Sequence, residues 1–183
     1  MWEQISANRT RSIMLVIGMG ALLIAVGYGI GVYFFESPLA GIAIASGLWV
    51  IMTLVGYFQG DSILLATAGA KKIEKKDHPR LFNVVEEMTI ASGLAKMPDV
   101  YIIDDPALNA FATGRDPNHA AVAITSGLLQ QLNRDELQGV IAHEMAHVKN
   151  RDVLLMSLAA VLLGSIVILS YYFSRMLFFS GGG

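Results

Sequence analysis

Three long runs of uncharged residues divide the chain. The first two, residues 12–35 and 37–60, have 24 residues each and are separated only by Glu36. The third, residues 153–174, has 22 residues. A helix needs about 20 apolar residues to cross the hydrocarbon core of a bilayer. The pattern therefore predicts three transmembrane helices, of which the first two form a hairpin that turns at residues 35–38.

The first apolar run is longer than the hydrophobic region of a cleaved signal peptide, and a second run follows it at once. A domain of this size could not bury three such helices in a soluble core, so we expect the hairpin to stay in the membrane. Small residues, which allow two membrane helices to approach closely, recur in both of its segments. They are Gly27, Gly29, Gly31, Gly41, Ala45 and Gly47.

Shorter patterns fill the segment between the second and third apolar runs. A helix is predicted to begin at Asp77-His78-Pro79 and to end at Ser92-Gly93, because a polar cap with Pro starts helices and Gly stops them. A second helix opens at residues 133–136 and carries apolar positions at helical spacing as far as Val148. Between them, three strands are predicted, at residues 99–103, 109–113 and 120–125.

The charged residues are concentrated in the same middle segment. Overall, 54% of the residues are hydrophobic and 15% are charged, against about 25% charged in an ordinary soluble domain. Residues 61–152 contain 23 of the 28 Lys, Arg, Asp and Glu residues. This division excludes a simple soluble globule, a disordered chain and a coiled coil. The net charge of −2, without a basic tract interleaved with aromatic residues, makes nucleic acid an unsuitable partner.

The fold class is therefore an α+β membrane protein with three parts. Residues 1–60 form the transmembrane helical hairpin, with spans at about 12–35 and 38–60. Residues 61–152 form an α/β domain portion. Residues 153–183 form the third transmembrane helix and a Gly-rich end.

Basic residues beside the spans predict the orientation of the hairpin, because cytoplasmic flanks carry an excess of Lys and Arg. Arg9 and Arg11 precede the first span, whereas the turn between the spans contains only Glu36. Lys71, Lys72, Lys75, Lys76 and Arg80 follow the second span. We therefore expect both outer flanks and the charged domain in the cytoplasm. The lysine run itself is either a solvated connector or a contact for lipid headgroups.

The second predicted helix contains the sequence His143-Glu144-Met145-Ala146-His147. Two His residues four positions apart lie on one helical face, about 6 Å from each other, and both can bind one Zn²⁺. Glu144 can then take a proton from a water molecule that the metal has acidified. The chain has no cysteine, so any metal must be held by His and carboxylate side chains. The alternatives are a surface helix with two unrelated His residues and a zinc site without hydrolysis.

Two longer stretches around this motif resemble the HtpX family of membrane zinc endopeptidases. They are residues 133–152 (NRDELQGVIAHEMAHVKNRD) and residues 97–129 (MPDVYIIDDPALNAFATGRDPNHAAVAITSGLL). The opening hairpin with its short turn is also similar, so the resemblance covers essentially the whole chain. It implies a small zincin-like α/β domain carrying the HExxH helix. It also implies a stress-response protease of the bacterial inner membrane that degrades misfolded or damaged membrane proteins, with its active site in the cytoplasm.

Residue by residue, the resemblance makes His143 and His147 zinc ligands, with one Zn²⁺ expected per chain, and Glu144 the catalytic base. It further suggests that one apolar run is the edge strand that holds substrate. A protease that cuts many sequences should bind backbone, which strand addition achieves. We assign this role to Ala120, Ala121, Val122, Ala123 and Ile124; the alternative is a plain core strand.

The third zinc ligand of a catalytic site is not provided by the motif. The resemblance implies a Glu on a downstream helix, after a further membrane segment, but no Glu follows Glu144. We therefore expect this sequence to be the N-terminal portion of a longer enzyme, with the third ligand beyond residue 183. Whether this chain alone is active depends on that ligand.

Other residues of the chain are weaker candidates for a third ligand. His119 lies near the presumed substrate strand, although a loop role explains it equally simply. Asp152 follows His147 by five positions, about 140° from the ligand face of a continuous helix, and should point away. His78 is expected at a helix start, and Asp104 and Asp105 in a turn.

Two other classes of function compete with the enzyme. One is a non-catalytic membrane fragment that binds zinc or a partner and lacks the third ligand; the retained Glu144 argues against it. The other is a metal transporter, which needs polar ligands inside its spans, whereas these spans contain no His, Asp or Glu. The expected partners are the lipid bilayer and misfolded membrane protein substrates, and the sequence leaves the oligomeric state open.

Overall fold

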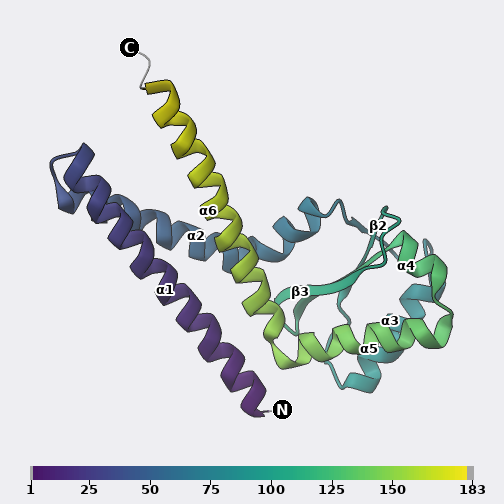
Figure 1. The fold of residues 1–183 in the computed structure, drawn as a ribbon. Helices are drawn as coiled ribbons and strands as arrows, with labels where there is room; N and C mark the ends of the chain where they lie inside the picture. Colours follow the sequence, from purple (N-terminus) through teal and green to yellow (C-terminus); the bar gives the residue numbers. More distant parts are fainter. Residues whose placement is uncertain (1, 181–183) are drawn as a thin grey trace.

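The computed structural model describes the backbone of residues 2–180 and the side chains from residue 3 onward, apart from residues 165, 169, 172–174 and 176–180. Long helices gather on one side of the molecule and a small α/β domain lies on the other (Figure 1). The predicted Gly-rich end, residues 181–183, lies outside the described residues.

The hairpin consists of α1 (Trp2–Phe34) and α2 (Pro38–Thr67). Both helices are long and apolar enough to cross a membrane. The predicted turn is confirmed, since Ser37 caps α2 by accepting a hydrogen bond from the Ala40 amide and Pro38 occupies its first turn. Helix α2 continues to Thr67, beyond the predicted end of the span, and so carries the chain into the α/β domain.

Four of the six small residues predicted to bring the hairpin helices together lie at the interface between them. A Cβ atom added to Gly41 would lie 2.7 Å from the Cα of Gly31, and one added to Gly27 would lie 2.6 Å from the Gly41 carbonyl oxygen. Ala45 packs at the same place as Gly27. A Cβ atom at Gly29 or Gly47 would meet nothing within 4 Å among the described residues. The close approach therefore depends on particular positions.

Helix α6 (Asp152–Ser180) begins at the third apolar run. It meets α5 (Arg134–Asn150) at an angle of 84°, and these two helices meet the length and composition criteria for a membrane span only when taken together as one bent pair. Helix α6 packs on α2, where Leu158 and Val161 contact Gly56. The third membrane crossing remains a prediction.

A four-stranded sheet forms the centre of the α/β domain, in the order β1-β2-β4-β3. Strand β4 runs parallel to β2 and antiparallel to β3, and β1 pairs antiparallel with β2. The strands are β1 (Lys71–Lys72), β2 (Asp99–Ile103), β3 (Ala110–Asp116) and β4 (His119–Thr125). The three predicted strands are confirmed. The short β1 was not predicted; it lies within the lysine run, where Lys72 forms an ion pair with Asp99 at 2.8 Å.

The prediction that residues 120–124 form an edge strand is wrong. They lie in β4, which pairs with β2 on one side and with β3 on the other. The backbone groups of Ala120, Ala121, Val122, Ala123 and Ile124 therefore point to neighbouring strands and leave no edge for a substrate. Strand β3 is the edge strand on this side of the sheet. The apolar run that suggested substrate binding instead reflects burial on both faces of an interior strand.

Helices cover both faces of the sheet. One face packs on α5 and on α3 (Pro79–Ser92), which begins and ends where predicted, with Gly93 in the left-handed conformation at φ 68°. The other face packs on the end of α2, where Leu65 clusters with Ile103, Ala121 and Ala123. A short helix, α4 (Ser126–Gln131), joins β4 to α5. The core on the α3 and α5 face contains Leu81, Val84, Val85, Val100, Val122, Ile124, Leu137, Ile141 and Met145.

Replacing Gly41 by Ala should destabilise the hairpin by about 1–3 kcal/mol, because the added methyl group overlaps the backbone of α1. Gly47→Ala, on the same helix but in open space, is the matched control. The free energy of unfolding in mixed micelles measures both. Equal stabilities for the two variants would contradict the close packing at Gly41.

A candidate metal site between helix α5 and the edge strand

Helix α5 is fixed at its start and along one face. The Asn133 side chain accepts hydrogen bonds from the first-turn amides, and the Glu136 carboxylate accepts one from the Asn133 amide, which completes a capping box. A fully buried apolar stripe then anchors the helix on the sheet and on α3. His143, Glu144 and His147 lie beside this stripe, and Glu144 contacts β3. The stripe consists of Leu137, Ile141, Met145 and Val148.

The imidazoles of His143 and His147 converge. The Nε2 atoms of His143 and His147 are 3.1 Å apart, with ring centroids 4.7 Å apart and ring planes at 89°. Two nitrogens bound to one tetrahedral zinc at 2.0–2.1 Å would be separated by about 3.3 Å. The pair therefore fits as two ligands of a single metal ion.

Asp152 lies beside this pair, contrary to the prediction that it points away. That prediction assumed one continuous helix through residues 147–152. The structure breaks the helix at Arg151, which has a left-handed backbone conformation with φ 58°. The break bends the chain by 84°, and Asp152 Oδ2 lies 2.8 Å from Nδ1 of His147.

The contact with Asp152 favours the form of His147 that could bind a metal ion through Nε2. A carboxylate beside Nδ1 favours the tautomer that carries its proton there, which leaves the Nε2 lone pair free to bind. The other carboxylate oxygen, Oδ1, is buried and has no hydrogen-bond partner in the described part of the chain. Asp152 therefore orients His147 through its Nδ1 atom, on the side of the ring away from Nε2, and is not itself placed as a ligand.

Glu144 bridges the space between α5 and the edge strand. Its Oε2 accepts a hydrogen bond from the Ala112 amide of β3 at 2.9 Å. Burial raises the pKa of the Glu144 carboxyl above its usual value, while His147, the Ala112 amide and His143 oppose this effect. A positive metal ion beside the two imidazoles would oppose it further. The carboxylate is therefore placed next to both a metal position and the backbone of an edge strand.

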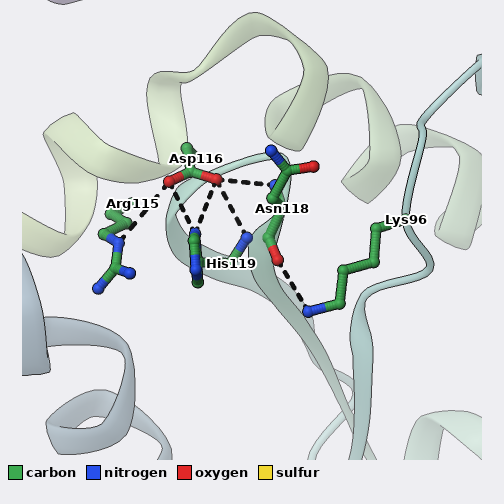
Figure 2. Close-up of polar contacts among 5 residues, drawn as sticks. All are labelled: Lys96, Arg115, Asp116, Asn118 and His119. Atoms are coloured by element: carbon green, nitrogen blue, oxygen red, sulfur yellow. Dashed lines mark hydrogen bonds and ion pairs between the residues drawn. The ribbon is translucent and has the colours of Figure 1, made fainter.

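The other candidate ligands lie elsewhere. His119 is held by Asp116 in the turn between β3 and β4, with its Nδ1 2.9 Å from Oδ2 (Figure 2). His78 caps α3 by accepting a hydrogen bond from the Leu81 amide, and Asp105 accepts one from Ala107 in a turn. Among the described residues, no three His, Asp or Glu side chains gather closely enough to hold a metal. The third ligand is therefore not among the described residues.

Residues 75–181 match Peptidase family M48. The chain belongs to this family. Membership implies a bound metal ion. A protease HtpX homolog of Lactobacillus helveticus is 41% identical over 182 residues, and one of Caldanaerobacter subterraneus subsp. tengcongensis is 40% identical over 183 residues. These matches confirm the resemblance to the HtpX family.

Each alignment covers 100% of this chain but only 61% and 60% of these two relatives, respectively. The chain thus spans about three fifths of the length of the curated relatives that it matches. Among solved structures, S. mikatae Ste24p aligns with 95% of this chain and 40% of its own, at 18% identity and a TM-score of 0.45. That likeness is too low to establish a shared fold.

Two parts of the site were not predicted from the sequence. They are Asp152, which contacts His147, and Ala112, which lies on the edge strand β3. The signal for Asp152 was present, because an Asp that precedes an apolar run is a typical first residue of a new helix. The edge position of Ala112 could not be predicted, because the sequence of a strand does not show whether it lies at the edge or in the interior of a sheet. Strand order within the sheet decides it.

Asp152→Asn should weaken zinc binding by about 10–100-fold, because the loss of an outer carboxylate leaves the ligand imidazole less well oriented and less basic. Asp116→Asn is the matched control, since Asp116 contacts Nδ1 of His119 in the same way but away from the site. Competition with a coloured chelator, on the protein in its full natural length, gives both affinities. An unchanged affinity for Asp152→Asn, or equal losses for both variants, would contradict this role.

Proposed function

We propose that the protein is a membrane-bound, zinc-dependent endopeptidase. The observation that carries the proposal is the convergence of the two Nε2 atoms, 3.1 Å apart, beside a carboxylate that contacts an edge strand. The membership in Peptidase family M48 supports it. The relatives that bear the name protease HtpX homolog support it further.

In this proposal His143 and His147 hold the metal and Asp152 orients His147. A zinc ion bound there would supply a Lewis acid and lower the pKa of a bound water. Glu144 accepts the proton of the attacking water and returns it to the leaving amine of the cleaved peptide bond. Its position beside both the metal position and the edge strand suits a group that must take a proton from the water and give it to the leaving amine.

The substrate would bind to β3 and not to β4. Thr125 donates its amide proton to the Asn109 carbonyl, so the backbone groups of Asn109 point towards β4. Because hydrogen-bonding directions alternate along an antiparallel strand, those of Ala110 and Ala112 point to the outer edge. An extended polypeptide can add there as a further strand, held through its backbone, which suits a protease of broad sequence preference.

The proposed setting is the bacterial inner membrane, with the site on the cytoplasmic side. The basic residues that flank the hairpin, Arg9 and Arg11 on one side and the lysine run on the other, support this orientation. The proposed substrates are misfolded or damaged membrane proteins that accumulate under stress. The support for this substrate class is the attachment of β3 to the membrane helices, described below.

A second candidate function is a membrane protein that binds zinc or a protein partner without cleaving it. The lack of a third ligand among the described residues favours this alternative. Glu144 favours the enzyme, because a binding site has no use for a half-buried carboxylate between the metal position and an edge strand.

Glu144→Gln should abolish proteolysis, by about 10²–10⁴-fold, while zinc stays bound, because only the proton acceptor is lost. His143→Ala should lose both zinc and cleavage, and His119→Ala, outside the site, should keep both. Zinc content and casein cleavage are measured on the protein in its full natural length, reconstituted with zinc. Cleavage by the Glu144→Gln protein at the unmodified rate would refute the assigned role.

A further inference from the structure

We propose that the site cuts membrane-anchored polypeptides with a fixed polarity, in which the membrane anchor lies on the N-terminal side of the cleaved bond. This inference rests on the proposed endopeptidase function and on substrate binding along β3. It adds the direction in which the substrate runs and the kind of substrate that this direction selects. Three features of the fold carry it.

The first feature is the direction of β3 relative to the hairpin. Near the start of the strand, Phe111 packs on the cluster that contains Leu65, close to the end of α2. Near its end, the guanidinium of Arg115 lies 5.6 Å from the ring centroid of Phe58. Phe58 precedes Leu65 by seven residues, which is about 10 Å along a helix and nearer to the bilayer. Strand β3 therefore runs towards the membrane.

The second feature is the path of α6 across the outer edge of β3. Ala112 packs against the cluster that contains Val153, at the start of α6. Thr113 points to the opposite face of the sheet, and its buried hydroxyl forms a 3.0 Å hydrogen bond with Ser157, one turn further along α6. Because β4 occupies the inner edge, α6 must pass from one face to the other around the outer edge. Figure 1 shows the first turns of α6 beside one end of β3.

The outer edge of β3 is consequently accessible only at the end of the strand where β3 begins. From Ala110 to Ala112 it pairs with no further strand in the described part of the chain, and the Glu144 carboxylate accepts a hydrogen bond from the Ala112 amide there. From Thr113 onward α6 covers this edge. A polypeptide that binds here can continue freely past Ala110, away from the membrane helices. At the other end it meets α6 and has to follow that helix towards the bilayer.

The third feature is the pairing direction. Antiparallel strands pair somewhat more stably per residue than parallel ones, so the substrate should run antiparallel to β3. Its N-terminal side then lies towards Thr113, α6 and the bilayer, and its C-terminal side leaves past Ala110. The preferred substrate is therefore a segment that directly follows a membrane span.

The distance from the cleaved bond to the membrane predicts a different minimum linker length for each side of the anchor. From Ala112 to Arg115 the strand rises by about 10 Å, which brings it to the level of Phe58. An anchor on the N-terminal side thus needs a linker of only about three extended residues to cover this distance. An anchor on the C-terminal side must leave past Ala110, reverse and return, which needs roughly twice that length or more.

The test uses the zinc-loaded protein in its full natural length, in lipid vesicles. Two sets of model substrates carry one transmembrane helix and one cleavable segment, with linkers of increasing length and the helix on either the N-terminal or the C-terminal side. We expect cleavage at short linkers only in the N-anchored set. Equal linker dependence in both sets, or the reverse order, overturns the polarity. The same segment as a free peptide is the control: if it is not cut, the proposed function fails and the inference fails with it.

A second readout does not depend on cleavage. Because residues 1–183 contain no cysteine, Ala110→Cys in the Glu144→Gln protein, with any cysteine beyond residue 183 replaced by serine, provides a single thiol at the open end of the edge. A substrate with a cysteine just after the cleavage site should form a disulfide with it at least fivefold faster than one with a cysteine just before that site. Ile90→Cys, at an exposed position of α3, is the control that measures the rate of disulfide formation by random collision. A faster reaction of the upstream cysteine would overturn the antiparallel arrangement.

Discussion

The sharp turn at Arg151 is the constraint on which the site and its membrane attachment depend. A residue other than glycine in the left-handed conformation costs about 1–2 kcal/mol, so its neighbours must hold it there. On one side, the side-chain amide of Asn8 in α1 donates a hydrogen bond from Nδ2 to the Asn150 carbonyl at 3.2 Å. On the other side, Asp152 pairs with His147 at 2.8 Å. The turn is thus fixed by contacts with the first membrane helix and with α5, the helix that carries the HExxH motif.

Two consequences follow from this single turn. The first is chemical, because the bend at Arg151 brings the Asp152 carboxylate next to Nδ1 of the His147 imidazole. The second is architectural, because the same bend directs α6 past β3 and onto α2. A continuous helix would lose both the Asp152 contact and the closed end of the substrate edge. The metal site and the membrane helices are therefore parts of one arrangement.

Local patterns predicted most of the elements but not how they meet. The apolar runs predicted the hairpin helices α1 and α2, and cap residues located the starts of α3 and α5, because these signals involve only neighbouring residues. The HExxH spacing identified the imidazole pair and the adjacent carboxylate in the same way. The edge strand was misassigned, since the order β1-β2-β4-β3 depends on contacts between residues far apart in sequence. Asp152 was misplaced because the turn at Arg151 is stabilised by Asn8, which lies 142 residues before Asn150.

The most direct test of this account compares zinc binding by Arg151→Gly and Arg151→Ile in the protein at its full natural length. Both substitutions remove the same charge, but glycine accepts the left-handed conformation and a β-branched residue strongly disfavours it. The account predicts that Arg151→Gly keeps the natural dissociation constant for zinc and that Arg151→Ile weakens binding at least tenfold. Equal dissociation constants for the two variants would contradict the claim that the turn assembles the site.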